Sequence, residues 1–419
     1  MIDDVFSGRV AILGLGYIGL PTAVALATRG IEVIGVDINQ SIVDAVSLGR
    51  VPFVEPDLAI AVSGAVSIGR LTATTVVPEA DAFIIAVPTP FQENRAADLS
   101  YVQSAVTQIA PRLKGGELVV LESTSPPGTT EQVSRWLAEL RPDLRLPHEA
   151  DGMSDIFVAH CPERVLPGRI MIEMITNDRV IGGVTRRCAD KAASLYRVFT
   201  QGEIITTDAS SAEMAKLVEN AYRDVNIAFA NELSLISERL RLDVWEIIRL
   251  ANHHPRVNIL TPGPGVGGHC IAVDPWFIVG AAPDLARLIR TAREVNDSKP
   301  LHVAQHVIEK ASRFRDPTVA CLGLTFKANV DDMRESPAVD VVAAIADAAP
   351  ELDIRVVEPY TQKLPPELDG RPNVRMQSAS DAIEEADIVV LLVDHDQFKT
   401  IPKSRLEGRV VFDTRGTWR

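Results

Sequence analysis

The stretch "RVAILGLGYIG", residues 9–19, joins an apolar run typical of a buried strand to a glycine-rich turn. Gly14, Gly16 and Gly19 have the GxGxxG spacing directly after this strand and at the start of a helical pattern. Glycines in that context permit a tight turn and let a pyrophosphate approach the N-terminus of the helix. The stretch therefore predicts a dinucleotide-binding α/β fold. The alternative is a glycine turn in a sheet that binds another ligand.

Three polar residues follow later strands of the same pattern. Asp37 ends the strand in "EVIGVDI", where an acid binds a ribose 2′-hydroxyl and repels a 2′-phosphate, so NAD is favoured over NADP. Thr89 follows the strand in "DAFIIAVPT", and Thr124 follows the strand in "GELVVLEST". Both threonines are therefore expected at the C-terminal edge of the sheet, where ligands of such sheets bind.

Alternating strand and helix patterns divide the chain into three parts. They continue to about residue 205, as in a parallel doubly wound sheet, with helical patterns at 98–113 and 128–140. From Asp208 about thirty residues have helical spacing without Pro or Gly, so we expect one long helix that links two domains and carries a subunit interface. The alternation returns from about residue 317. We predict two Rossmann-like doubly wound domains joined by a central helical domain with a spine helix, with boundaries at 1–205, 206–312 and 313–419.

Composition and charge exclude several classes of protein. The formal net charge of −14 argues against a nucleic-acid partner, and no run reaches about 18 uncharged apolar residues, as a membrane span requires. The start of the chain lacks the basic region of a secretory signal, so we expect a cytoplasmic protein. The four cysteines are far apart without a CxxC pair. We therefore expect reduced thiols and no metal site.

The loop "TPGPGVGGHCIAVDPWFIV", residues 261–279, surrounds Cys270 with glycines and prolines. Such a backbone makes neither a good helix nor a central strand, and is shaped for close approach. Cys270 is therefore a candidate nucleophile, although a cysteine is more often a small core residue. Asp274 is a candidate for orienting a water, the alternative being a turn cap before Pro275.

A polar row is expected on the long helix. Lys216 and Asn220 are four residues apart and Arg223 is three further, so the three side chains share one face. A row of this kind on a buried helix suits an anionic substrate. The alternative is an ordinary solvated stripe.

The chain resembles the UDP-glucose and GDP-mannose dehydrogenases, a family of nucleotide-sugar 6-dehydrogenases. The resemblance covers essentially all 419 residues, through "GLGYIGLPTA", "AVPTPF", "ESTSPPGTTE", "CPERVLPG", "AEMAKLVENAYRDVNIAFANELSLI", "NHHPRVNILTPGPGVGGHCIAVDPWFIV" and "KANVDDMRESP". It implies a four-electron oxidation of a sugar C6 alcohol to a carboxylate with two NAD+ and one water. It also implies a UDP-sugar-binding C-terminal domain and a homodimer formed through the central helical domain.

The resemblance also implies roles for individual residues. Cys270 is the expected nucleophile, which passes through a thiohemiacetal and a thioester. Lys216 is the proton donor or acceptor and oxyanion stabiliser, Asn220 its hydrogen-bonding partner, and Asp274 an orienting group. Glu163 looks like the base that activates the hydrolytic water, the alternative being a salt bridge with Arg164. Expected NAD contacts are Gly14, Gly16, Tyr17, Ile18, Gly19, Asp37, Thr89, Thr124 and Arg334, and expected substrate contacts are Arg164, Val165, Leu166, Lys216, Asn220, Arg223, His254, Arg256, Gly267, Lys327 and Arg334.

The substrate is expected among UDP-N-acetylhexosamines, because the "NHHPRVNI" stretch is more similar to that branch than to the glucose branch. Ile42 stands where the glucose branch often has a basic residue, so the resemblance extends to the pyrophosphate turn but departs from that branch near the adenosine. We expect UDP-N-acetyl-D-mannosamine, with its C2 epimer UDP-N-acetyl-D-glucosamine as the alternative. More remote alternatives are a two-electron hydroxyacid dehydrogenase and a non-catalytic nucleotide-sugar sensor.

Overall fold

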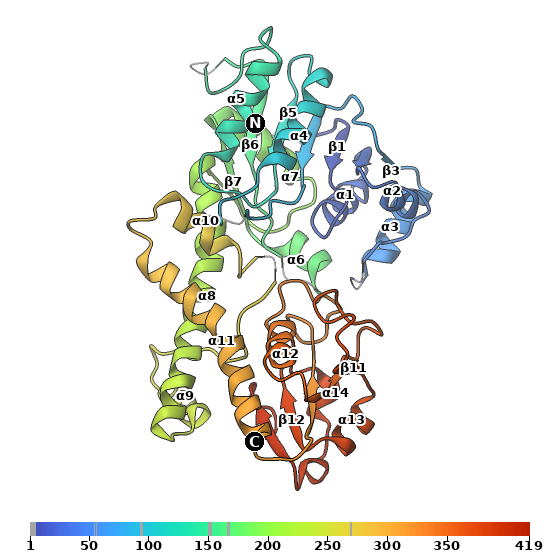
Figure 1. Cartoon of the computed structure of the whole chain (residues 1–419). Coiled ribbons are helices and arrows are strands. Elements are labelled where there is room, and N and C mark those ends of the chain that lie inside the picture. Colours follow the sequence, from blue (N-terminus) through green and yellow to red (C-terminus); the bar gives the residue numbers. More distant parts are fainter. Residues whose placement is uncertain are drawn as a thin grey trace. The chain divides into compact units, whose positions relative to one another are not determined.

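The computed structural model describes residues 6–419 apart from residues 54, 56, 93–94, 150–152, 166–167 and 269 (Figure 1). The chain forms two compact units, Met1–Glu219 and Asn220–Arg419. The boundary between them falls inside one helix, α8 (Ala209–Leu240). The division into three domains stays a prediction.

The first unit is built on an eight-stranded sheet with the order β3-β2-β1-β4-β5-β6-β7-β8. Its strands are β1 (Val10–Leu13), β2 (Val33–Val36), β3 (Leu71–Thr74), β4 (Ala82–Ile85), β5 (Leu118–Leu121), β6 (Phe157–His160), β7 (Arg179–Gly183) and β8 (Ile204–Asp208). All neighbouring strands are parallel except β6 and β7, which pair antiparallel. The predicted parallel doubly wound sheet is confirmed, and among the described strands β6–β7 is the one pair that departs from it. The connecting helix α6 (Ile170–Thr176) is short and packs on α1, so it does not carry the chain back along the sheet.

Helices cover both faces of this sheet, because successive strand residues point to opposite sides. Val10 and Ile12 of β1 pack in a core with α1, whereas Ala11 and Leu13 pack in a second core with α4 and α5. The result is the three-layer arrangement expected of a doubly wound fold. Its further helices are α1 (Gly19–Ala27), α2 (Gln40–Ser47), α3 (Leu58–Ser67), α4 (Ser100–Ile109), η1 (Ala110–Arg112), α5 (Thr129–Leu140) and α7 (Arg186–Tyr196).

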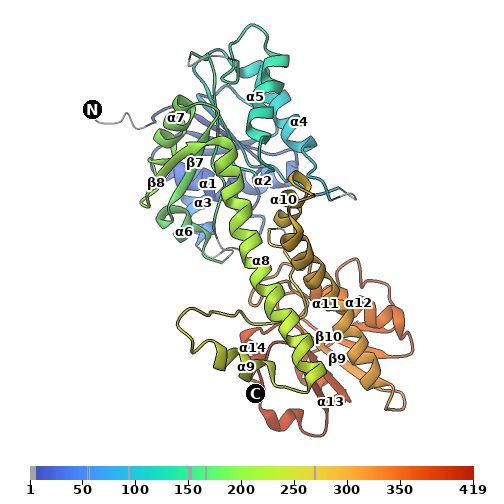
Figure 2. The same cartoon turned by 90° about the vertical axis from the view of Figure 1, so that its left-hand side faces the viewer.

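Helix α8 is one continuous helix of 32 residues, as the sequence predicted (Figure 2). Asp208 caps it: its carboxylate accepts hydrogen bonds from the backbone N–H of Ser211 at 2.9 Å and from its hydroxyl at 2.6 Å. These bonds hold the pKa of Asp208 below its usual value. The other helices of the central region are α9 (Val244–Ala251), α10 (Asp274–Ala281) and α11 (Arg287–Ala311).

The second unit contains a five-stranded parallel sheet with the order β11-β10-β9-β12-β13. Its elements are β9 (Thr318–Leu322), α12 (Pro337–Ala348), β10 (Asp353–Val357), β11 (Val374–Met376), α13 (Ala379–Glu385), β12 (Ile388–Leu391), α14 (Asp396–Lys399), η2 (Lys403–Leu406) and β13 (Val410–Asp413). Val319 and Cys321 pack toward α11 and α12, whereas Ala320 and Leu322 pack toward α13 and α14. The second α/β sheet is thus confirmed. Within the described part of the chain, no helix combines the length and the apolar character that crossing a membrane requires.

Candidate active site

The glycine-rich turn at the end of β1 leaves room for a ligand. Gly14 has φ +96°, and a Cβ there would lie 2.5 Å from the Ala86 carbonyl oxygen. A Cβ on Gly19 would lie 1.9 Å from the Gly14 carbonyl oxygen, so the fold itself requires both glycines. A Cβ on Gly16 meets no atom within 4 Å. The backbone at Gly16 is therefore open at the start of the buried helix α1, where an anion is favoured.

Residues around this turn fit the ribose end of NAD. The Asp37 carboxylate follows β2 and accepts hydrogen bonds from the N–H groups of Leu15 and Asn39, both at 2.9 Å. These bonds hold the acid against the glycine turn, where each oxygen still has capacity to accept from a ribose hydroxyl. Ile18 immediately precedes α1, and Tyr17 stacks on Phe53 with ring centroids 4.2 Å apart.

The two threonines predicted at the sheet edge are in contact. The Thr89 hydroxyl, after β4, donates a 2.6 Å hydrogen bond to the Thr124 carbonyl, after β5. Both lie at the C-terminal ends of their strands, on the edge where the glycine turn also lies.

Glu163 is paired with a residue that the sequence interpretation did not identify. Its Oε2 lies 3.0 Å from Nη2 of Arg179, and the two side chains are only 5% and 4% exposed. The expected alternative, a salt bridge with Arg164, is wrong: only the backbone N–H of Arg164 donates to Glu163, at 2.8 Å. The Arg164 guanidinium pairs with Glu219 instead, at 2.5 Å. The rings of Tyr196 and Phe199 lie beside the Arg179 guanidinium, with centroids 5.1 and 5.0 Å away.

A second buried carboxyl group, Glu122, lies near this pair. It accepts hydrogen bonds from the hydroxyls of Thr22 and Tyr196, both at 3.1 Å. Burial, followed by the charge of Glu163, raises the pKa of Glu122 to about 8. Glu122 is therefore mostly protonated at neutral pH.

The exposure of the thiols separates Cys270 from the other cysteines. Cys161, Cys188 and Cys321 are buried, and Cys270 is exposed. Burial raises the pKa of both Cys161 and Cys321 to about 12, which leaves them as thiols at neutral pH. Cys270 is thus the cysteine that a substrate can reach.

Cys270 lies in the turn that leads into α10. Its carbonyl accepts hydrogen bonds from the N–H groups of Val273 at 3.2 Å and Asp274 at 2.9 Å. Asp274 begins α10 and is only 2% exposed. Its Oδ2 accepts a 2.5 Å hydrogen bond from the Asn220 amide of α8. The structure therefore brings together two of the predicted catalytic residues, Asn220 and Asp274, one helical turn from Cys270.

The glycines of the cysteine loop pack against the chain near residue 335. A Cβ on Gly267 would lie 2.1 Å from the Glu335 carbonyl oxygen, and one on Gly265 would lie 2.8 Å from Pro337. Gly268 has φ +85°, and a Cβ there would lie 2.9 Å from the Phe326 ring. The close approach that the sequence indicated is therefore explained by packing within the second unit.

The remaining predicted residues have varied surroundings. Lys216 is buried on α8, Arg223 is exposed on the same helix, and Val165 packs against the core of the first unit. His254 and Arg256 are exposed after α9, and Nδ1 of His254 accepts a 3.3 Å hydrogen bond from the Arg256 N–H. The Lys327 carbonyl accepts from the Thr325 hydroxyl at 2.8 Å, and Arg334 forms a 2.6 Å ion pair with Asp332. Leu166 lies outside the described residues. Glu163 and Lys216 belong to the first unit, and Asn220, Cys270 and Asp274 to the second.

Three family models match successive parts of the chain. They describe the NAD-binding, central and UDP-binding domains of the UDP-glucose/GDP-mannose dehydrogenase family, at residues 8–200, 210–298 and 320–419. Together with the glycine turn and the exposed cysteine, they define an NAD-dependent nucleotide-sugar dehydrogenase. The chain belongs to the UDP-glucose/GDP-mannose dehydrogenase family.

Relatives of known name are similar over almost their whole length. An NDP-N-acetyl-D-galactosaminuronic acid dehydrogenase of Ralstonia nicotianae is 58% identical over 99% of this chain and 97% of its own. A UDP-N-acetyl-D-mannosamine dehydrogenase of Campylobacter jejuni is 54% identical over 95% of this chain and 98% of its own. The solved UDP-D-ManNAc dehydrogenase of Pyrococcus horikoshii is 38% identical with a TM-score of 0.88, over 98% of this chain and 96% of that chain.

Proposed function

We propose that this enzyme oxidises UDP-N-acetyl-D-mannosamine at C6 to the uronate, with two NAD+ and one water per sugar. The observation that carries the proposal is the exposed thiol of Cys270, one turn from the Asn220–Asp274 pair, on a chain of this family. The names of several relatives support the choice of an N-acetylhexosamine.

The open turn at Gly16 and the Asp37 carboxylate would hold NAD+, which would supply the hydride acceptor for both oxidations. Lys216 takes the C6 hydroxyl proton and then stabilises the oxyanion, as a buried cation can in a site of low dielectric. The Cys270 sulfur, its proton lost to water, forms a bond to the aldehyde carbon while the C=O π electrons move to oxygen, and gives a thiohemiacetal oxyanion that Lys216 stabilises. Loss of the second hydride turns that adduct into a thioester, so the aldehyde is never released.

Hydrolysis of the thioester needs a base that is held in one orientation. Glu163 has this property, because Arg179 and the Arg164 N–H fix its two carboxylate oxygens. In our proposal Glu163 takes a proton from the attacking water while the C–S bond breaks and the Cys270 thiol is restored. The hydrogen bond between Asn220 and Asp274 fixes the turn that carries Cys270 against α8 at Asn220.

We assign the binding of the UDP-sugar to the substrate positions expected from the sequence. Their basic members are Arg164, Lys216, Arg223, His254, Arg256, Lys327 and Arg334. A local positive field is needed because the chain as a whole carries a formal charge of −14, which repels a diphosphate. We also place the enzyme in the cytoplasm, a reducing compartment in which its four cysteines are stable as thiols.

A second candidate substrate is UDP-N-acetyl-D-galactosamine. The relatives with 58% identity to this chain are named for the galacto uronic acid, and those named for mannosamine have 53–54% identity. The two candidates share the C6 oxidation and differ in the stereochemistry of the sugar ring.

The proposal is tested by incubating the purified chain with NAD+ and, in turn, the manno, galacto and gluco UDP-N-acetylhexosamines. We expect two NADH per molecule of UDP-N-acetyl-D-mannosamine and the lowest KM for that sugar. One NADH per sugar would contradict the four-electron reaction. Turnover of the galacto sugar alone would replace the first candidate with the second.

The variant Cys270→Ser is the matched test of the thioester step. It should still bind the UDP-sugar but form no uronate. The serine hydroxyl is a weaker nucleophile than a thiol and cannot form a thioester. Full acid production by this variant would remove Cys270 from the mechanism.

A further inference from the structure

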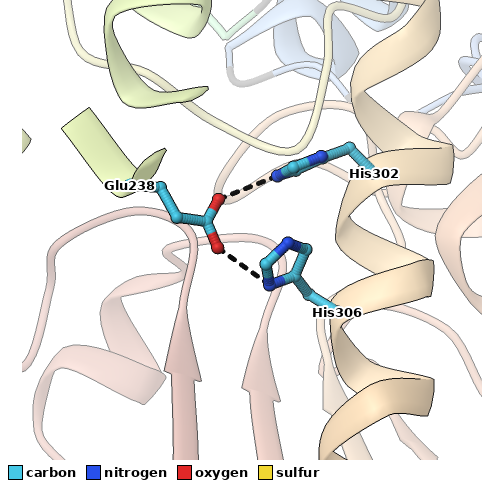
Figure 3. A group of neighbouring side chains, drawn as sticks. All are labelled: Glu238, His302 and His306. Atoms are coloured by element: carbon cyan, nitrogen blue, oxygen red, sulfur yellow. Dashed lines mark hydrogen bonds and ion pairs between the residues drawn. The ribbon is translucent and has the colours of Figure 1, made fainter. Parts of the chain in front are cut away.

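A carboxylate and two imidazoles meet near the C-terminal end of α8 (Figure 3). Oε2 of Glu238 lies 2.8 Å from Nε2 of His302, and Oε1 of Glu238 lies 2.8 Å from Nδ1 of His306. The ligand atoms of the three residues lie within 4.8 Å of one another. No part of the proposed reaction uses this cluster.

The two histidines are presented by one helix. His302 and His306 are four residues apart on α11, so their rings lie one above the other on the same face, with centroids 4.5 Å apart. Two imidazoles at this spacing on a helix are a ready pair of metal ligands. Glu238 comes from the last turn of α8 and supplies the third donor from the opposite side.

Buried contacts fix the two helices against each other at this point. Asp224, Asn231 and Glu238 are seven residues apart on α8, and each contacts a residue of α11. Asp224 pairs with the fully buried Arg293 at 2.6 Å, and Asn231 donates to Asn296 at 2.8 Å. Glu238 is the last residue of this row. Its partners are the partly exposed imidazoles of His302 and His306. The cluster is therefore preorganised by contacts that do not involve its own residues.

We propose that Glu238, His302 and His306 form a binding site for a divalent transition-metal ion of the Zn²⁺ class. Two imidazole nitrogens and one carboxylate oxygen are a donor set that suits such ions, whereas Mg²⁺ and Ca²⁺ prefer oxygen ligands alone. We did not predict this site from the sequence. Our expectation of no metal site considered only the spacing of the cysteines, and this cluster contains none.

Binding requires a change in where the ring protons lie. A carboxylate only accepts, so each ring nitrogen that faces Glu238 carries the proton when no ion is bound. For an ion to bind, these nitrogens must present lone pairs, and each proton moves to the other nitrogen of its ring. The side chains are 40%, 33% and 24% exposed for Glu238, His302 and His306, so an aquated ion can enter and water can complete its coordination.

One neighbouring charge opposes the ion. Lys299 is buried on the same helix as the histidines and interacts electrostatically with Glu238. The Lys299 ammonium group neutralises the Glu238 carboxylate, so a metal ion competes with it for this negative charge. Lys299→Met should therefore tighten metal binding, a result that a cluster held only by histidine–glutamate hydrogen bonds does not predict.

The site is tested by calorimetric titration of the untagged full-length chain with Zn²⁺, and with Co²⁺ followed by its visible absorption. We expect one ion per chain. His302→Ala, His306→Ala and Glu238→Gln should each weaken binding at least about tenfold, since each removes a direct ligand. His253→Ala removes an exposed imidazole elsewhere in the second unit and should leave the affinity unchanged.

Cys270→Ala is the second control, because an exposed thiolate also binds Zn²⁺. Binding that survives this change and is lost in the three cluster variants supports the site. Loss of binding in Cys270→Ala, or equal affinity in wild type and the cluster variants, overturns it. So does displacement of Zn²⁺ by an equal concentration of Mg²⁺.

Discussion

Two buried carboxyl groups of the first unit, Glu163 and Glu122, have different partners. Glu163 faces the buried Arg179, whereas Glu122 is bonded to two hydroxyls. Glu163→Gln should lower the free energy of unfolding by about 3–5 kcal/mol, because it leaves a buried guanidinium without its counter-charge. The measurement is the urea midpoint at pH 6. An unchanged midpoint would show that Arg179 does not depend on Glu163, and any loss of activity in this variant must be corrected for the unfolded fraction.

Glu122→Gln is the matched control, and its effect depends on pH in a defined direction. The pKa of Glu122 is raised from 4.5 to about 8 in the folded state, so the folded protein binds more protons than the unfolded chain between these values. This contribution to stability is complete below about pH 4.5 and is lost as the pH rises through about 8. The amide does not titrate, so the variant should gain stability relative to wild type as the pH increases from 6 to 8. A constant difference across that range would contradict the raised pKa.

Single residues differ in how far the sequence could predict them. Gly14, Gly19 and Asp37 were predicted because their roles depend on the backbone of one strand–turn–helix unit. The pairing of Arg179 with Glu163 was not predicted. Arg179 lies near Glu163 because strands β6 and β7 pair, and local sequence does not specify which residue neutralises a buried charge. Among the described catalytic positions, Asn220 and Asp274 were each predicted, but their hydrogen bond depends on tertiary packing.

One carboxylate joins helix α8 to the start of helix α5 through hydrogen bonds. Glu213 of α8 accepts hydrogen bonds from the N–H groups of Gly128 at 2.6 Å and Thr130 at 2.7 Å, and from the Thr130 hydroxyl at 2.6 Å. Glu213→Ala should lower the free energy of unfolding by about 2–3 kcal/mol, because buried donors at the helix N-terminus lose their acceptor. The check is chemical denaturation followed by circular dichroism.

Glu131→Ala on α5 is the control for this change. Glu131 also lies in the first turn of α5, but it forms an exposed pair with Arg135, and such pairs contribute less than about 1 kcal/mol. An equal decrease in the free energy of unfolding in the two variants would mean that the hydrogen bonds of Glu213 do not stabilise α8 more than an exposed ion pair does.

Long, uninterrupted patterns were predicted well, and short elements were not. Helix α8 was evident because no Pro or Gly interrupts its periodicity. The antiparallel entry of β7 was missed, because strand direction is determined by the length and packing of the connection rather than by strand composition. The four-residue helix α14 is likewise too short to show a period of 3.6 residues.

Helix α8 has polar side chains on the face toward α11 and exposed apolar side chains on the opposite face. The α11-facing row contains Asp224, Asn231 and Glu238, whereas Tyr222, Phe229 and Ile236 are two residues earlier in each case and lie roughly 200° around the helix. These three apolar side chains are 71%, 52% and 47% exposed. An apolar stripe repeated every seven residues on a long helix is typical of a subunit interface. We therefore propose that a second copy of the chain covers it.

Phe229→Glu tests this homodimer by placing a charge in the middle of the stripe. We expect the dimer dissociation constant to rise at least about thirtyfold, corresponding to about 2 kcal/mol, because the carboxylate is desolvated without a partner. Sedimentation velocity over a series of protein concentrations measures the change.

Ile60→Glu, on α3 of the first unit, is the control. It alters a side chain that is 79% exposed but lies off the stripe, and should leave association unchanged. A wild-type chain that stays monomeric at micromolar concentration, or equal association of both variants, would contradict the interface.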